Sequence, residues 1–146
     1  MEIDRSGCEV LTRPECLRLL AGESLGRLGL HAGALPVILP VAYALVDGSV
    51  VVRTHQAALL YRAARGSVVA FEVDRSPGDG VGWSGGWSGG WSVHVTGLAE
   101  EVTDPDDVAR LRSVPLRSWA PDHGDRFIRI SIELLTGRRL ADVAAA

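Results

Sequence analysis

Residues 49–74 read SVVVRTHQAALLYRAARGSVVAFEVD, and this stretch decides the fold that the sequence predicts. Its two ends, residues 49–54 and 67–74, are β-branched runs bounded by turn signals, which is typical of buried strands. Between them, four apolar residues recur at helical spacing: Ala57, Leu60, Tyr61 and Ala64. The stretch therefore predicts a strand, a short helix and a second strand.

Four polar residues fall where the first of these strands gives way to the helix: Arg53, Thr54, His55 and Gln56. A helix N-terminus carries free backbone N–H groups and the positive end of the helix dipole, so it favours anions. A guanidinium and a hydroxyl are groups that bind phosphate. One interpretation is a phosphate site at Arg53 and Thr54, with His55 as a further contact. The other is a solvated strand end followed by a plain connection.

Composition indicates one domain over residues 1–146, because 146 residues with 47% hydrophobic content can bury a substantial core. No apolar run is long enough to span a membrane, and the first residues lack the pattern of a signal peptide. We therefore expect a cytoplasmic protein without a membrane partner. A net charge of −3 without a dense basic run argues against nucleic-acid binding.

Several chemistries are disfavoured by residue usage. All 15 Lys and Arg residues are Arg, so no lysine can form a Schiff base with pyridoxal phosphate. Cys8 and Cys16 are expected to be reduced thiols, with an extracellular disulfide as the alternative. The four histidines show no metal-ligand spacing, so no metal site is expected. No catalytic residue stands out, and the catalytic assignment stays unknown.

The N-terminal half predicts a helix and three strands after a loose lead-in over residues 1–11. A capping box at Thr12 and Glu15 begins a helix over residues 14–21. Residues 24–31 and 35–46 are strand-like, and an Asp47-Gly48 turn leads into residue 49. Three consecutive strands joined by short turns predict an antiparallel meander.

The C-terminal half adds two strands and a helix. Residues 91–103 alternate, a helix begins at Asp104, and residues 126–135 form a last strand before a short tail. The whole chain thus predicts a mainly β (α+β) fold, a six-stranded antiparallel β-barrel with short flanking helices.

A Gly-rich loop at about residues 75–90 leads into the next strand through a repeat of the four-residue unit GWSG, which reads GWSGGWSGGWS over residues 82–92. Trp83 and Trp87 allow two interpretations. They form an aromatic flap that stacks on a ring ligand, or they are spare tryptophans in a loop that is costly to order.

With its motifs in order, the chain resembles the pyridoxamine-phosphate-oxidase-like flavin-binding split-barrel family, and its actinobacterial members in particular. The resemblance covers about residues 12–140. The matching pieces are LGRLGL (25–30), LPVILPVAYALVDGSVVVRT (35–54), GSVVAFEVD (66–74), GWSVHVTGLAEEV (90–102) and RFIRISIELLTGRRL (126–140). It implies a split barrel that forms a homodimer, with flavin mononucleotide (FMN) bound at the interface and its phosphate near the third strand.

The resemblance also implies roles for individual residues. It implies a cofactor-binding role for the strand end at the possible phosphate site and for residues of two other strands: Pro40, Val41, Tyr43, Arg53, Thr54, Trp91 and Ser92. It places Trp119 and Arg138 toward the partner subunit's site, with less weight. The function implied is that of an FMN-dependent oxidoreductase acting on a small-molecule substrate.

One departure from the family pattern concerns the phosphate. Relatives usually follow the Arg-Thr pair with a Gly and then a Lys or Arg that binds phosphate, whereas this chain has Ala57 and Leu59. Losing a charge-assisted bond costs about 1.5–3 kcal/mol, or roughly 10- to 100-fold in affinity. Arg62 or Arg65 is a possible substitute. The alternatives are a cofactor-free binding or structural protein, a deazaflavin-dependent reductase and a haem-binding protein.

Overall fold

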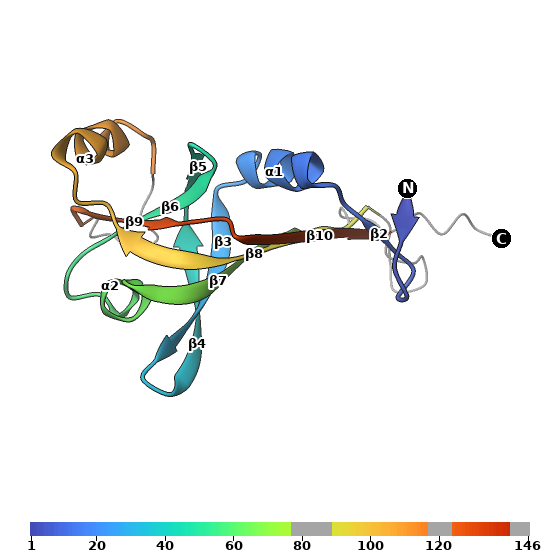
Figure 1. Cartoon of the computed structure of the whole chain (residues 1–146), viewed down its shortest axis with the longest axis horizontal. Coiled ribbons are helices and arrows are strands. Elements are labelled where there is room, and N and C mark those ends of the chain that lie inside the picture. Colours follow the sequence, from blue (N-terminus) through green and yellow to red (C-terminus); the bar gives the residue numbers. More distant parts are fainter. Residues whose placement is uncertain (77–88, 117–123, 141–146) are drawn as a thin grey trace.

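The computed structural model describes residues 1–76, 89–116 and 124–140 (Figure 1). Its strands are β1 (Glu2–Ile3), β2 (Cys8–Val10), β3 (Leu25–Ala32), β4 (Leu35–Ala42), β5 (Ala44–Val46), β6 (Ser49–Thr54), β7 (Ser67–Arg75), β8 (Trp91–Glu101), β9 (Arg126–Ile130) and β10 (Leu134–Leu140). Its helices are α1 (Arg13–Ala21), α2 (Leu59–Ala64) and α3 (Pro105–Arg112).

The strands close into an antiparallel barrel. β3 pairs with β4 and β7, and β7 pairs with β8. β8 pairs with β9, β9 with β6, and β6 with β5, which continues the path of β4. When β4 with β5 and β9 with β10 are each taken as one bent strand, the barrel has six strands. The predicted fold class is therefore confirmed.

The run Val50, Val51 and Val52 in β6 shows why this stretch decides the fold. Val50 and Val52 face the main core inside the barrel, whereas Val51 faces a second core that contains Leu111 of α3 and Phe127 of β9. All three valines are at most 1% exposed. A strand buried on both faces needs a continuous apolar run, and that is what the sequence supplies.

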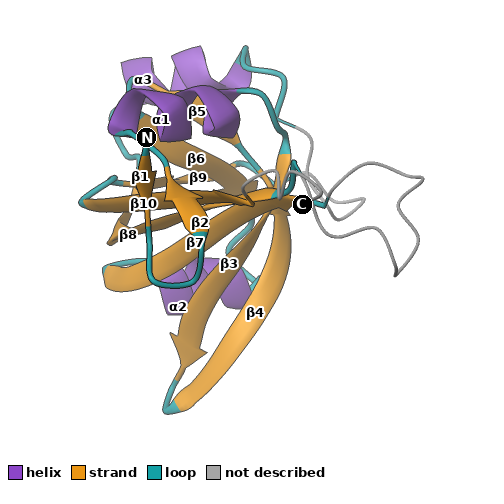
Figure 2. Ribbon diagram, turned by 90° about the vertical axis from the view of Figure 1, so that its right-hand side faces the viewer, coloured by secondary structure: helices purple, strands orange, loops and turns teal. Residues whose placement is uncertain are grey.

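Two of the described helices, α1 and α3, begin where their caps predict. Thr12 and Glu15 form the predicted capping box of α1, and the Asp104 carboxylate caps α3. Figure 2 and Figure 1 both show α1 and α3 on one side of the barrel and α2 on the other. In the part of the chain that the structure describes, none of these helices has the length and apolar character that crossing a membrane requires.

Three expected boundaries were wrong. The lead-in is not loose, because β1 and β2 form a hairpin and β2 extends the sheet by pairing with β10. The strand expected over residues 35–46 breaks at Tyr43, so that β4 pairs with β3 and β5 pairs with β6. The last strand breaks at residues 131–133 and then continues as β10 to Leu140, five residues beyond the expected end.

The break in the last strand has a steric cause at Gly97. Gly97 in β8 lies against the backbone of Ser131, so closely that a Cβ atom there would collide with the Ser131 carbonyl. The Ser131 N–H donates a hydrogen bond to the carbonyl of Leu98 at 3.1 Å. Residues 131–133 therefore form a bulge between β9 and β10, and the glycine leaves room for this bulge to pack against β8.

Candidate functional site

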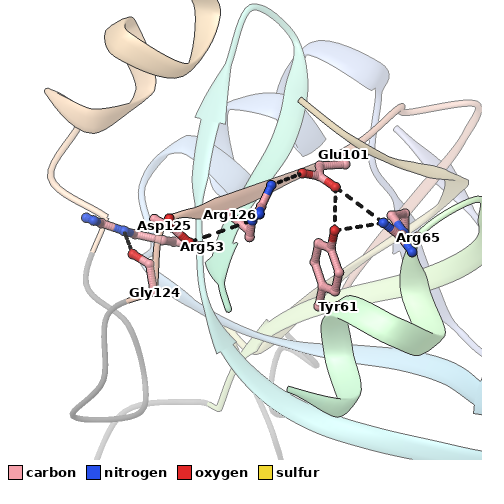
Figure 3. Close-up of polar contacts among 7 residues, drawn as sticks. All are labelled: Arg53, Tyr61, Arg65, Glu101, Gly124, Asp125 and Arg126. Atoms are coloured by element: carbon pink, nitrogen blue, oxygen red, sulfur yellow. Dashed lines mark hydrogen bonds and ion pairs between the residues drawn. The ribbon is translucent and has the colours of Figure 1, made fainter. Parts of the chain in front are cut away.

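Arg53 is held in a defined position at the end of β6. Its Nε donates a hydrogen bond to the Gly124 carbonyl at 2.8 Å, and its guanidinium lies 5.4 Å from the ring centroid of Phe127. Figure 3 shows the guanidinium directed toward Gly124 and away from Glu101. Among the described residues its two Nη groups have no hydrogen-bond partner, so they remain available for an anion.

The side chain of Thr54 does not lie on the same face of β6 as Arg53, and His55 lies beyond the end of the strand. Neighbouring strand residues point to opposite faces, so Thr54 faces the barrel interior, where it is 6% exposed. The segment after it forms a turn in which Ala58 N–H donates to the His55 carbonyl at 3.0 Å. The helix expected from the spacing of Ala57, Leu60 and Ala64 begins only at Leu59. The predicted helix N-terminus is therefore not beside Arg53, and the case for a phosphate here rests on the guanidinium.

The second-strand candidates divide between core and surface. Val41 and Tyr43 are 5% and 4% exposed and belong to the main core. The Tyr43 hydroxyl donates to the Leu20 carbonyl at 2.6 Å, and its ring packs edge-on against Phe71. Burial raises the pKa of Tyr43. Pro40 is exposed on β4.

Trp91, Ser92 and Arg138 come together at the far end of the barrel. They line a cleft of about 230 Å³ between the ends of β7, β8 and β10. Ser92 and Arg138 are paired across the sheet, and the Arg138 Nε lies 3.1 Å from a carboxylate oxygen of Asp4. The hydrogen bond from the Cys8 N–H is the largest cause that lowers the pKa of Asp4, and Arg138 lowers it further.

A charged cluster that the sequence did not reveal lies near Arg53, around Glu101 (Figure 3). The Glu101 carboxylate accepts hydrogen bonds from the Tyr61 hydroxyl at 2.7 Å and from Arg126 at 3.2 Å. Arg65 donates to the Tyr61 hydroxyl at 2.7 Å and lies 3.6 Å from Glu101. The bond from Tyr61 is the main cause that lowers the pKa of Glu101, and Arg126 and Arg65 add to it.

This cluster limits which arginine could replace the missing basic residue. Leu59 opens α2 with 38% exposure, and Arg62 is exposed on the same helix. Arg65 is already engaged by Glu101. No local signal could reveal the cluster, because its members come from α2 and the residue after it, from β8 and from β9. Trp83, Trp87 and Trp119 lie outside the described residues.

The comparisons with known proteins place the chain in a family. The family described as Pyridoxamine 5'-phosphate oxidase matches residues 12–139. An uncharacterized protein of Mycobacterium tuberculosis is 40% identical over 136 residues, which cover 89% of this chain and 84% of the relative. This protein therefore belongs to the pyridoxamine 5'-phosphate oxidase family.

Solved structures agree in fold. An FAD binding protein from Mycobacterium smegmatis superposes with a TM-score of 0.74 and 30% identity, covering 90% of this chain and 97% of that chain. An FAD-binding protein from Mesorhizobium loti has a TM-score of 0.69 at 24% identity, covering 92% of this chain and 99% of that chain, and it shares the fold.

Proposed function

We propose that this protein is a flavin-nucleotide-binding oxidoreductase that binds FMN at Arg53, acts on a small molecule and works as a homodimer. The observation that carries the proposal is the geometry of Arg53, whose Nε and ring contact hold the guanidinium while its Nη groups have no partner among the described residues. The similar protein named for FAD binding supports a flavin nucleotide. When bound, a flavin supplies the redox chemistry of hydride or electron transfer.

The residues present fit the phosphate end of such a cofactor. A guanidinium donates two parallel bonds to phosphate oxygens, and pre-ordering reduces the entropy lost on binding. The Glu101 cluster, with Arg126 paired opposite Thr54, stiffens the neighbouring strand ends. The role of this chain is thus to anchor the phosphate and fix the orientation of the nucleotide.

The distance between the two groups of candidate residues supports the homodimer. Arg53 pairs with Phe127, whereas Arg138 lies eleven residues further along the same bent strand, a path of roughly 36 Å that the break at residues 131–133 shortens. This separation exceeds the length of a flavin mononucleotide. A cofactor anchored at Arg53 would meet Trp91, Ser92 and Arg138 only if a second copy supplied them.

The second candidate is a binding protein that has lost its cofactor. The observation that favours it is Leu59, an apolar residue at the position where relatives place a basic phosphate ligand. A deazaflavin and haem are the remaining alternatives, and the visible spectrum of the purified protein distinguishes both from a flavin.

The test compares FMN with riboflavin, which lacks the phosphate, in titrations of the wild-type protein and Arg53→Ala. We expect the wild type to bind FMN more tightly, and Arg53→Ala to weaken FMN binding about 10- to 100-fold without affecting riboflavin. Arg129→Ala is the matched control, because Arg129 is an exposed arginine on β9. Equal affinity of the wild type for both ligands would overturn the phosphate site, and binding of neither would favour the cofactor-free protein.

A further inference from the structure

The segment from Gly124 to Phe127 provides both contacts of the Arg53 guanidinium. The Gly124 carbonyl accepts the hydrogen bond from Nε at 2.8 Å, and the Phe127 ring centroid lies 5.4 Å from the guanidinium carbon. Arg126 lies between these two residues and is the first residue of β9. The position of the guanidinium therefore depends on how firmly this segment is held.

The start of β9 is held from both faces of the sheet. Neighbouring strand residues point to opposite faces, so Phe127 and Arg126 are held by different parts of the molecule. Phe127 packs in the second core with Val51 and Leu111, whereas Ile128 packs in the main core inside the barrel. Arg126 lies on the same face as Ile128. Its charged side chain therefore needs a polar partner at the end of the barrel interior.

That partner is Glu101, at the end of β8, whose side chain is 12% exposed. One of its carboxylate oxygens accepts a hydrogen bond from Arg126 at 3.2 Å, and the other accepts one from the Tyr61 hydroxyl at 2.7 Å. Figure 3 shows Arg126 reaching toward Glu101 while the Arg53 guanidinium is directed to the opposite side, toward Gly124. Glu101 therefore contacts Arg53 only indirectly, through the segment that holds it.

The charge of Arg126 depends on Glu101. The Arg126 Nε is buried and has no hydrogen-bond partner within the described part of the chain. The Asp125 carboxylate lies 3.7 Å from this Nε, but its side chain is 75% exposed, so water screens it. Removing one partner of a half-buried ion pair leaves the other charge uncompensated. Without Glu101, the Arg126 side chain would turn toward water and loosen the start of β9.

We propose that Glu101 is a positioning residue for the phosphate anchor: through Arg126 it holds the segment that orients the Arg53 guanidinium. This inference rests on the proposed function. A guanidinium that is held before the ligand arrives loses less entropy on binding, and having to order one long side chain lowers affinity about 2- to 12-fold. The effect is confined to ligands that carry a phosphate, because Glu101 acts only on the anchor.

The test measures the phosphate preference, defined as the ratio of FMN affinity to riboflavin affinity, in titrations of the wild type and Glu101→Gln. Glutamine keeps the size of the side chain but replaces one carboxylate oxygen by an NH₂ group, which cannot accept a bond from Arg126 or Tyr61. We expect the preference to fall about 2- to 12-fold. A merely structural role would weaken both ligands alike and leave the ratio unchanged.

Glu9→Gln is the matched control. Glu9 accepts a hydrogen bond from Arg139 at the same distance of 3.2 Å, and its side chain is 18% exposed. This pair joins β2 to β10, at the other end of the barrel from Arg53. Glu9→Gln should therefore leave the phosphate preference at the wild-type value. A second comparison adds Glu101→Gln to Arg53→Ala, where no further loss of preference is expected because the anchor is already gone.

The outcomes separate the positioning role from the proposed function. Equal affinity of the wild type for FMN and riboflavin would overturn the phosphate site and the positioning role with it. A wild-type preference that Glu101→Gln leaves intact, or a further loss in the Arg53→Ala background, would overturn the positioning role while the phosphate site stands. If Glu101→Gln does not fold, Arg126→Gln replaces it, because it removes the same ion pair. A lower preference then supports the role, and an unchanged one overturns it.

Discussion

Arg53 and Gly124, 71 residues apart in the chain, are joined by a hydrogen bond of 2.8 Å from the guanidinium Nε to the glycine carbonyl. This bond requires a glycine at position 124. Gly124 has a φ of +55°, and a Cβ atom there would collide with the backbone of Thr54. The position of the guanidinium therefore depends on a glycine that no strand or helix contains.

Gly124→Ala should destabilise the protein and displace Arg53. The left-handed φ and the collision together should lower the free energy of unfolding by about 1–3 kcal/mol, and FMN affinity should fall with it. Urea unfolding and FMN titration measure the two effects. Gly33→Ala is the control, because Gly33 also has a positive φ but has open space around it. An FMN affinity equal to that of Gly33→Ala would contradict this role of Gly124.

Leu59→Lys should restore the basic residue of the family pattern at the start of α2. A charge-assisted bond to the phosphate should raise FMN affinity about 10- to 100-fold, and riboflavin affinity should not change. Leu59 is 38% exposed, so a lysine can reach solvent without unfolding the helix. Ala109→Lys, at an exposed position on α3, controls for added charge. An equal gain in both variants would show a non-specific electrostatic effect.

Glu101→Gln should reduce stability at neutral pH and have less effect in acid. The pKa of Glu101 is lowered in the folded protein from its usual value of 4.5, chiefly by the Tyr61 hydroxyl. The carboxylate therefore stabilises the fold above that value, and the contribution disappears as pH falls through the lower folded pKa.

The measurement is urea unfolding of both proteins at about pH 7 and about pH 3. The wild type should be more stable by about 1–3 kcal/mol at the higher pH, and the difference should shrink at the lower pH. Because Asp4 and Glu15 also have lowered pKa values, only the difference between the two proteins isolates Glu101. A difference that grows toward low pH would sink this assignment.

Tyr43→Phe should separate a structural role from cofactor binding. It removes the bond to the Leu20 carbonyl and keeps the ring against Phe71. Because the carbonyl loses its short hydrogen bond and keeps only the longer one from the Glu23 N–H at 3.5 Å, the free energy of unfolding should fall by about 0.5–1.5 kcal/mol. FMN affinity should not change. A large loss of affinity at unchanged stability would instead place Tyr43 in the cofactor site.

Much of the fold could be predicted because its signals are local. The valine run of β6, the capping box at Thr12 and the turn at Asp47 each act within a few residues. Asp47 and Gly48 both have positive φ in the β5–β6 hairpin, as the turn predicts. Less of the candidate site could be predicted. Arg53 and Thr54 are both polar and adjacent in sequence, but strand alternation directs their side chains to opposite faces of β6.

By itself the sequence determined most of the barrel strands, the caps of α1 and α3 and the barrel class, since periodicity and turn chemistry depend on neighbours in the chain. Only the tertiary structure decided which side chains meet. It set the bond between Arg53 and Gly124, gathered Tyr61, Glu101 and Arg126, and put Arg138 at the opposite end of the barrel. These relationships depend on strand register and on the bulge opposite Gly97, where long-range packing outweighs local preference.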